Sequence, residues 1–217
     1  MFKFEEIFRQ KRKLNLLCLG AHCDDIEIGC GGTILKLAGL ADSVQIKWVV
    51  FCSTDVRKRE AEQSADLFLT DVANKDIEIM NFRDGFLPSA WSSVKTEFER
   101  IKEKSLPDIV FTHFRHDLHQ DHRTLNELTW NTFRNHFILE YEIPKYDGDI
   151  GNPNLFVTID RDLLNKKIEI LHKCFKSQLQ KQWFDETLLT SLPRLRGMEC
   201  ASETNFAEAF YSRKLTL

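Results

Sequence analysis

The chain has 217 residues, of which 42% are hydrophobic and 29% charged, and its formal net charge is −3. This length suits one large α/β domain with a substantial core, and the charge provides no electrostatic basis for binding nucleic acid or an anionic membrane. The six cysteines form no Cys-x-x-Cys pair, no apolar run reaches the roughly 20 residues of a membrane span, and the N-terminus lacks the apolar core of a signal peptide. We therefore expect a soluble cytoplasmic protein with reduced thiols and no integral membrane segment.

Apolar periodicity predicts alternating strands and helices after an amphipathic lead-in at residues 1–13. The expected elements are strand 14–19, helix 32–39, strand 45–51, helix 57–68, strand 76–80, helix 89–104, strand 108–112 and helix 123–137. The looser C-terminal part adds strands 139–143 and 155–159, helices 161–175 and about 178–190 (ending before Pro193), and an edge element at 206–216. This alternation is typical of a mostly parallel sheet, so we expect a single Rossmann-like three-layer α/β domain over residues 1–217.

The first candidate functional stretch follows strand 14–19, where a tight turn carries His22, Asp24 and Asp25. Charged groups at the end of a buried strand need a partner, a metal or a catalytic role to offset their desolvation. We therefore interpret this stretch as half of a metal site. The glycines at 29, 31 and 32 are interpreted as part of the turn, because their spacing does not match a dinucleotide-binding loop.

The second half is a histidine-rich loop after strand 108–112, and its strongest part is His119-Gln-Asp121-His122. Because ligands of such sheets lie at the carboxyl ends of the strands, both stretches are expected to share one site. His22, Asp25 and His122 then form a two-histidine, one-carboxylate set with an open position, as a catalytic Zn²⁺ requires; Fe²⁺, Mn²⁺ or Co²⁺ would accept the same donors. The alternative interpretation is a buried polar network or a helix-capping set.

Together the two stretches resemble the PIG-L/LmbE-like family of zinc-dependent N-acetylglucosaminyl deacetylases. The family's first motif, Ala-His-Pro-Asp-Asp with a Gly-rich continuation, is present as Ala21-His-Cys-Asp-Asp25 and Gly29-Cys-Gly-Gly-Thr33. Its second motif, Asp-x-His-x-Asp-His, is intact from Asp117 to His122. Weaker agreement continues through Arg59-Glu60, Asp84, Ser177-Gln178, Arg196-Gly197 and Ala207-Glu-Ala-Phe210, so the resemblance covers nearly the whole chain.

The resemblance implies that His22, Asp25 and His122 bind zinc, with Asp24 as the general base. Zinc would lower the pKa of its bound water towards roughly 7, and Asp24 would take the water's proton and return it to the leaving amine. His119, if protonated, would stabilise the oxyanion, and Asp121 would hold the His119 ring and favour its charged form. For His119 and Asp121 a purely structural role is the alternative.

The family's proline between the histidine and the first aspartate is Cys23 here, so a slightly looser turn and thiol ligation of the metal are open alternatives. Alternation along the turn predicts that Cys23 points away from the site. Arg59, Asp84 and Arg196 are candidate substrate-binding residues, although an exposed charge on a helix or loop is the ordinary interpretation of each. His113 and His116 are left without a role.

We accordingly expect a metal-dependent hydrolase that removes acetyl from an N-acetylated amino sugar or its glycoside, nucleotide-linked or lipid-linked conjugate. Its partner would be this small-molecule substrate, no nucleic acid is expected, and a homo-oligomer is possible. One alternative keeps the metal site and changes the bond to another N-acyl amide. The other is a catalytically silent, sugar-binding member of the same fold.

Overall fold

The computed structural model describes residues 13–40 and 43–215, so the lead-in predicted at residues 1–13 lies almost wholly outside the described residues. Its centre is a seven-stranded sheet in the order β3-β2-β1-β4-β5-β7-β6. The strands are β1 (Lys13–Gly20), β2 (Ser43–Cys52), β3 (Asn74–Phe82), β4 (Ile109–His113), β5 (Phe137–Tyr141), β6 (Leu155–Ile159) and β7 (Phe206–Ser212). β7 pairs antiparallel with both neighbours and the other pairs are parallel, which confirms the predicted, mostly parallel α/β sheet.

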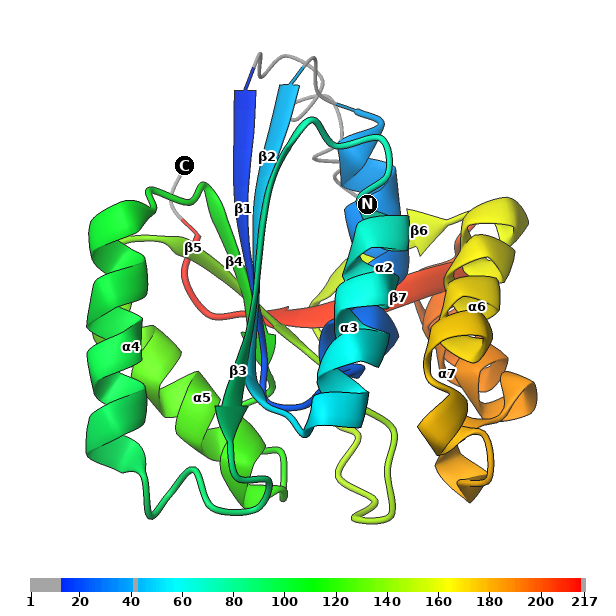
Figure 1. Cartoon of the computed structure of the whole chain (residues 1–217). Coiled ribbons are helices and arrows are strands. Elements are labelled where there is room, and N and C mark those ends of the chain that lie inside the picture. The colour runs from blue at the N-terminus through cyan, green and yellow to red at the C-terminus, as the bar shows by residue number, and fades with distance from the viewer. Residues whose placement is uncertain (1–12, 41–42, 216–217) are drawn as a thin grey trace.

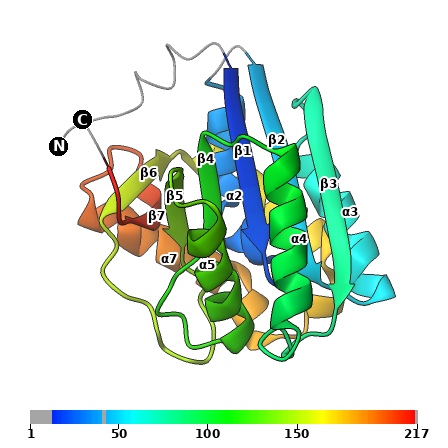
Figure 2. The same ribbon diagram turned by 90° about the vertical axis from the view of Figure 1, so that its left-hand side faces the viewer.

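Helices cover both faces of this sheet (Figures 1 and 2). One face carries α4 (Trp91–Lys104) and α5 (Gln120–Thr132), and the other carries α2 (Asp25–Ala38), α3 (Asp55–Phe68), α6 (Arg161–Cys174) and α7 (Glu186–Glu199). Each face has its own buried apolar cluster, so the central strands read as continuous apolar runs. In the described part of the chain, no helix has the length and apolar character needed to cross a membrane.

Helix α2 begins at Asp25, well before the predicted start at residue 32. The three glycines at 29, 31 and 32 lie inside this helix, and the interpretation of them as a turn is wrong. They allow close packing, because a Cβ at any of them would come within about 3.0 Å of another residue's side chain. The neighbours are Tyr141 for Gly29, Phe68 for Gly31 and Glu208 for Gly32. This run of glycines, which resembles a loop in the sequence, therefore forms a tightly packed face of a helix.

Two later predictions also need correction. The predicted helix 178–190 is replaced by two short 3₁₀ helices, Lys176–Gln178 and Gln182–Phe184, followed by α7, which starts after the capping side chain of Asp185 and includes Pro193. The element predicted at the sheet edge, β7, lies between β5 and β6, and β6 forms the edge. Helix α5 starts at Gln120 and ends at Thr132, earlier than the predicted 123–137, and β5 begins at Phe137.

Candidate metal and catalytic site

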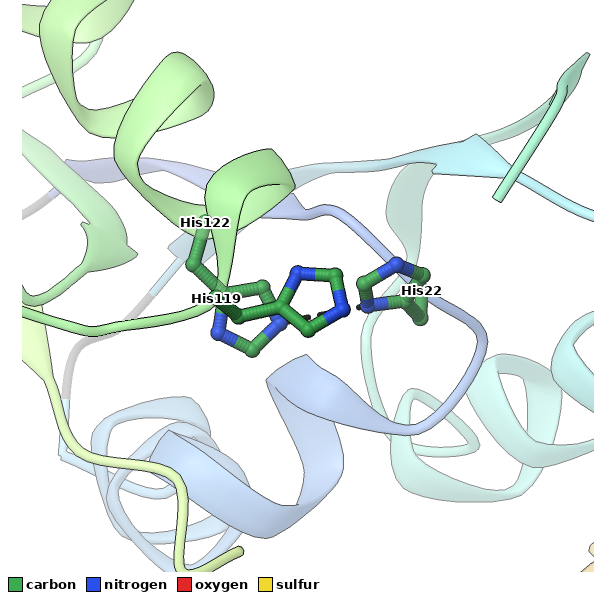
Figure 3. Close-up of side chains that lie close together, drawn as sticks. All are labelled: His22, His119 and His122. Atoms are coloured by element: carbon green, nitrogen blue, oxygen red, sulfur yellow. Dashed lines mark hydrogen bonds between the residues drawn. The ribbon is translucent and has the colours of Figure 1, made fainter. Parts of the chain in front are cut away.

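The candidate site lies where β1 and β4 end side by side. β1 leads into α2 and β4 leads towards α5, and these helices lie on opposite faces of the sheet (Figure 1). Strand order reverses at this point, and open α/β sheets bind ligands in the crevice formed there. Figure 3 shows His22, from the turn after β1, facing His119 and His122 at the start of α5.

His22 Nδ1, Asp25 Oδ2 and His122 Nε2 form a compact triangle. The separations are 3.2 Å between the two histidines, 3.4 Å between His22 and Asp25, and 3.5 Å between His122 and Asp25. Zinc binds imidazole nitrogen and carboxylate oxygen at about 2.0–2.2 Å, so two corners of a tetrahedron around it lie about 3.3–3.6 Å apart. The triangle therefore has the size and the donor atoms of a three-ligand metal site.

Further candidate ligand atoms surround this triangle. Besides the triangle, the described residues contain three overlapping groups that could hold an ion: His22, His119 and His122; His22, Asp84, His119 and Asp121; and Asp25, His113 and His122. Cys23 belongs to none of them. Its buried thiol donates to the carbonyl oxygen of Cys52 at 3.3 Å, and burial raises the pKa of the thiol to about 12. The geometry thus gives no support to thiolate ligation.

The protonation states of Asp25 and His122 follow from burial and from neighbouring charges. Burial by itself would raise the pKa of Asp25, but His122, His113 and His22 hold this pKa well below its usual range. Burial, reinforced by His113, lowers the pKa of His122 to about 4. A carboxylate and a neutral imidazole are the protonation states that a metal ligand needs. The third triangle residue, His22, differs: burial lowers the pKa of its ring, but Asp25, Asp121 and Asp84 raise this pKa well above the usual range, so a bound metal has to displace a proton there.

A second carboxylate orients His122. Asp117 Oδ2 lies 2.8 Å from His122 Nδ1, so the ring can present Nε2 to the triangle. Asp117 is itself buried and forms an ion pair with Lys145 at 3.0 Å. Carboxylates that hold the second nitrogen of a ligating histidine determine its tautomer and orientation. The sequence interpretation gave Asp117 no role, although its place in the second motif was available as a signal.

His113 packs against the proposed ligand His122. Its ring stacks on that of His122 with centroids 3.8 Å apart, and its Nε2 accepts from the backbone amide of Ala21 at 2.9 Å and lies 3.3 Å from Asp25 Oδ2. Because the Ala21 amide occupies the lone pair of Nε2, this ring packs beside the triangle rather than completing it. His116 is exposed and packs edge-on against Phe114.

The carboxylate of Asp121 holds His22 rather than His119. Its oxygens accept from the amides of Gly85 at 2.6 Å and Leu87 at 3.0 Å, and Oδ2 lies 3.2 Å from His22 Nε2. The contact predicted between this carboxylate and the His119 ring is therefore wrong. The backbone amide of Asp121 donates to His119 Nδ1 at 3.2 Å instead, which makes His119 the N-cap of α5.

This cap bond bears on the protonation of His119. A ring whose Nδ1 accepts a hydrogen bond is neutral and carries its proton on Nε2. Burial and the neighbouring His22 also lower the pKa of His119. The structure thus favours a neutral Nε2–H donor over the charged ring expected from the sequence.

Asp24 lies beside the triangle and is only 3% exposed. Burial raises its pKa to about 6, against the lowering influence of the Arg57 guanidinium, which lies 3.0 Å from Asp24 Oδ2. Arg57 also donates to the carbonyl oxygen of Cys23 at 2.7 Å. The site therefore contains a buried carboxylate that is paired with an arginine, and the pKa of this carboxylate is close to neutral pH.

The structure brings one of the three predicted substrate-binding residues into the site. Asp84 is largely exposed, and its carboxylate lies 3.0 Å from His22 Nε2. Arg59 is exposed on α3 and donates to the backbone of Asp55, so it does not reach the site. Arg196 is buried on α7, where it pairs with Glu142 at 2.7 Å and with Glu199.

Arg57 is the residue that the sequence interpretation missed. On a helix, positions 57 and 59 point to nearly opposite sides, because each residue turns by about 100°. The buried positions of α3 are Ala61, Ser64, Ala65 and Phe68. Since Arg57 precedes Ala61 by one turn, this apolar spacing was a usable signal that Arg57, rather than Arg59, faces the fold.

Comparison with known proteins identifies the family of this chain. The family model of the GlcNAc-PI de-N-acetylases (PIG-L) matches residues 17–133, and the chain belongs to this family. The uncharacterized deacetylase YaiS of Escherichia coli (strain K12) is 28% identical over 171 residues, which cover 75% of this chain and 91% of YaiS.

Solved structures share the fold at lower identity. N,N'-diacetylchitobiose deacetylase from Pyrococcus horikoshii has 24% identity and a TM-score of 0.73, with 98% of this chain and 87% of that chain covered. The 4-carboxy-2-hydroxymuconate hydratase GalB from Pseudomonas putida KT2440 has 16% identity and a TM-score of 0.71, with 94% and 98% covered. The fold is thus shared by deacetylases and a hydratase, so the chemistry of this chain has to be argued from its site.

Proposed function

We propose that this chain is a metal-dependent hydrolase that removes the acetyl group from an N-acetylated amino sugar or its conjugate. The observation that carries the proposal is the triangle of His22, Asp25 and His122 with the separate buried carboxylate of Asp24 beside it. Three ligands and a free base are what hydrolysis at a catalytic metal requires. Membership of a deacetylase family supports the choice of an acetamide as the bond.

His22, Asp25 and His122 would hold the metal, for which we propose Zn²⁺; Fe²⁺, Mn²⁺ and Co²⁺ accept the same nitrogen and oxygen donors. When bound, such a metal supplies Lewis acidity and lowers the pKa of water towards neutrality. Asp121 keeps His22 in place through Nε2, and Asp117 keeps His122 in place through Nδ1. Both supporting carboxylates are buried, which preserves the orientation of the ligand rings.

Asp24 is proposed as the general base. A carboxyl with a pKa of about 6 is mostly ionised at pH 7 and still accepts a proton in the transition state. The same group then returns this proton to the departing amine. Its guanidinium partner, Arg57, keeps the carboxylate in place.

His119 is proposed as the donor to the developing oxyanion. Its Nδ1 is occupied by the α5 cap, so Nε2–H is the group available for a substrate oxygen. Removal of one such donor typically raises the barrier by about 2.7–4 kcal/mol. Asp84, next to His22, is the proposed substrate contact on the exposed side. All six cysteines are free and buried, which supports our proposal of a reducing, cytoplasmic compartment.

The test measures acetate released from N-acetylglucosamine conjugates by the Zn²⁺-loaded protein. We expect Asp24→Asn to lower kcat by about 10²- to 10⁴-fold, the usual contribution of a general base, with Zn²⁺ still bound. Full activity of Asp24→Asn would contradict the assigned mechanism. Activity only on other N-acyl amides would shift the substrate class, and a protein that binds sugar without turnover would support the silent alternative.

A further inference from the structure

A buried ion pair forms hydrogen bonds to the backbone of α2, the helix that begins at the site. Lys167 of α6 is 2% exposed and Glu208 of β7 is 4% exposed, and their charged groups lie 2.7 Å apart. Both side chains reach the backbone of α2. Glu208 accepts from the amides of Gly32 at 2.9 Å and Thr33 at 2.6 Å, and Lys167 donates to the carbonyl oxygen of Ile28 at 2.7 Å.

Two of these contacts, at the Gly32 amide and the Ile28 carbonyl, involve the two groups of one backbone hydrogen bond, and the Thr33 amide belongs to the next one. In an α-helix the amide of residue 32 faces the carbonyl of residue 28. The Glu208 carboxylate therefore accepts from the amide of this backbone hydrogen bond, and the Lys167 ammonium donates to its carbonyl oxygen. Gly32 makes the approach possible, because a Cβ there would lie 3.0 Å from Glu208 Oε1.

Helix α2 needs such support because its own sequence stabilises it poorly. Three glycines lie in its first eight residues, and each costs about 1 kcal/mol relative to alanine in a helix interior. Asp24 occupies the N-cap position but makes no side-chain cap bond, since its carboxylate pairs with Arg57. The N-cap of α2 thus lacks the side-chain bond that usually defines a helix start, and the local bond present is that of Asp25 Oδ2, which accepts from the His22 amide at 2.7 Å.

That first turn carries Asp25, which lies about one turn before Ile28. We propose that Lys167 and Glu208 are positioning residues, which hold the start of α2 so that Asp25 completes the metal triangle and Asp24 lies beside it. The anchors come from α6, which lies on the same face of the sheet as α2, and from β7, which belongs to the sheet itself (Figure 1). The catalytic part of this proposal rests on the proposed function, whereas the metal-binding part does not.

The test separates positioning from stability with three variants. Lys167→Met and Glu208→Gln each leave one buried charge without its partner, so both should lower Tm. The double variant Lys167→Met/Glu208→Gln has no charge at either position, so it should regain much of the lost Tm. It still lacks the anchoring contacts, because one of the two α2 amides now faces the NH2 group of the glutamine side chain and the Ile28 carbonyl has lost its side-chain donor. We expect its affinity for Zn²⁺ alone, measured by competition with a chromophoric chelator, to remain roughly tenfold below wild type.

Glu208→Asp provides a second measurement that does not depend on recovery of the double variant. It keeps the charge near Lys167 but shortens the reach to the amides of α2, so it should fold normally and still bind Zn²⁺ more weakly, with kcat lowered and KM nearly unchanged. Val94→Ala, a buried change on α4, is the control for lower Tm alone and should retain wild-type affinity.

Wild-type Zn²⁺ affinity in folded Glu208→Asp, or in the double variant once its Tm has recovered, would overturn the proposal. An equal loss of affinity in Val94→Ala would do the same. If the wild-type protein binds Zn²⁺ but releases no acetate, the proposed function fails while the affinity comparison still decides this inference.

Discussion

Two helices begin at the candidate site, and they are held there in different ways. Helix α5 is specified locally: the His119 ring accepts from the Asp121 amide, and Asp117 accepts from the His119 amide at 2.8 Å. The residues that start this helix are the residues of the second motif. Its ligand, His122, is therefore oriented by neighbours within a few positions in sequence.

Helix α2 has less local support, because Asp25 Oδ2 accepts from the His22 amide at 2.7 Å but the N-cap side chain makes no cap bond. Its N-cap side chain is engaged by Arg57, its first turns contain three glycines, and its backbone is held by Lys167 and Glu208 from distant parts of the chain. One half of the site thus depends on local capping chemistry and the other on tertiary packing. The same kind of ligand can be positioned either way, and the two halves should respond differently to mutation.

The largest effect is expected at Gly29 in α2. An alanine Cβ there would lie 2.6 Å from Cγ of the Tyr141 ring, whose hydroxyl donates to the Leu19 carbonyl at the end of β1. Because both partners are buried, we expect Gly29→Ala to lower the free energy of unfolding by about 3 kcal/mol or more, measured by urea denaturation.

The matched control is Gly39→Ala at the end of the same helix. Its φ of −90° suits any residue, and the nearest atom to an added Cβ is 3.6 Å away. The free energy of unfolding should change by less than about 1 kcal/mol. Equal losses at both glycines would show that flexibility, rather than packing, explains the glycines of α2.

The next effect concerns the ion pair that engages Asp24. Charge-assisted hydrogen bonds contribute about 1.5–3 kcal/mol. We therefore expect Arg57→Ala to lower kcat/KM for acetate release by roughly 10- to 150-fold. Arg59→Ala, two positions along α3 and exposed, should stay within about twofold of wild type. The opposite ranking would restore the sequence prediction for Arg59.

The smallest effect on stability is expected at the cap of α5. His119→Ala removes the acceptor for the Asp121 amide and should cost about 1 kcal/mol of unfolding free energy, whereas His119→Asn should keep a cap. Both variants lose the imidazole, so acetate release should fall in both. Denaturation curves separate the two roles, and equal stability of the variants would contradict a local cap.

The sequence predicted the parts of the site that depend on short-range order. Strands predicted at 14–19 and 108–112 end at the same edge of a parallel sheet, so the stretches that follow them were expected to share one site, and the pairing of β1 with β4 brings them together. The structure places His22, Asp25 and His122 within 3.5 Å of one another and Asp24 beside them. What the motifs could not predict was how each ligand is supported.

Part of that support comes from partners far away in sequence, whereas Asp117 holds His122 from within the same motif. Asp121 was predicted to hold His119 and holds His22, and Arg196 was predicted to bind substrate and forms a buried pair with Glu142. Neither outcome follows from spacing, because a long polar side chain can reach several partners and only the packed structure selects one.

By itself, the sequence determined the α/β alternation, the two motifs and the residue types of a metal site, since these depend on periodicity and on donor chemistry. Only the tertiary structure decided that the glycines at 29, 31 and 32 belong to a helix. A glycine's freedom is equally suited to a turn and to close packing, and its role depends on what approaches it. Here Tyr141, Phe68 and Glu208 approach, so these glycines pack one face of α2 against residues remote in sequence.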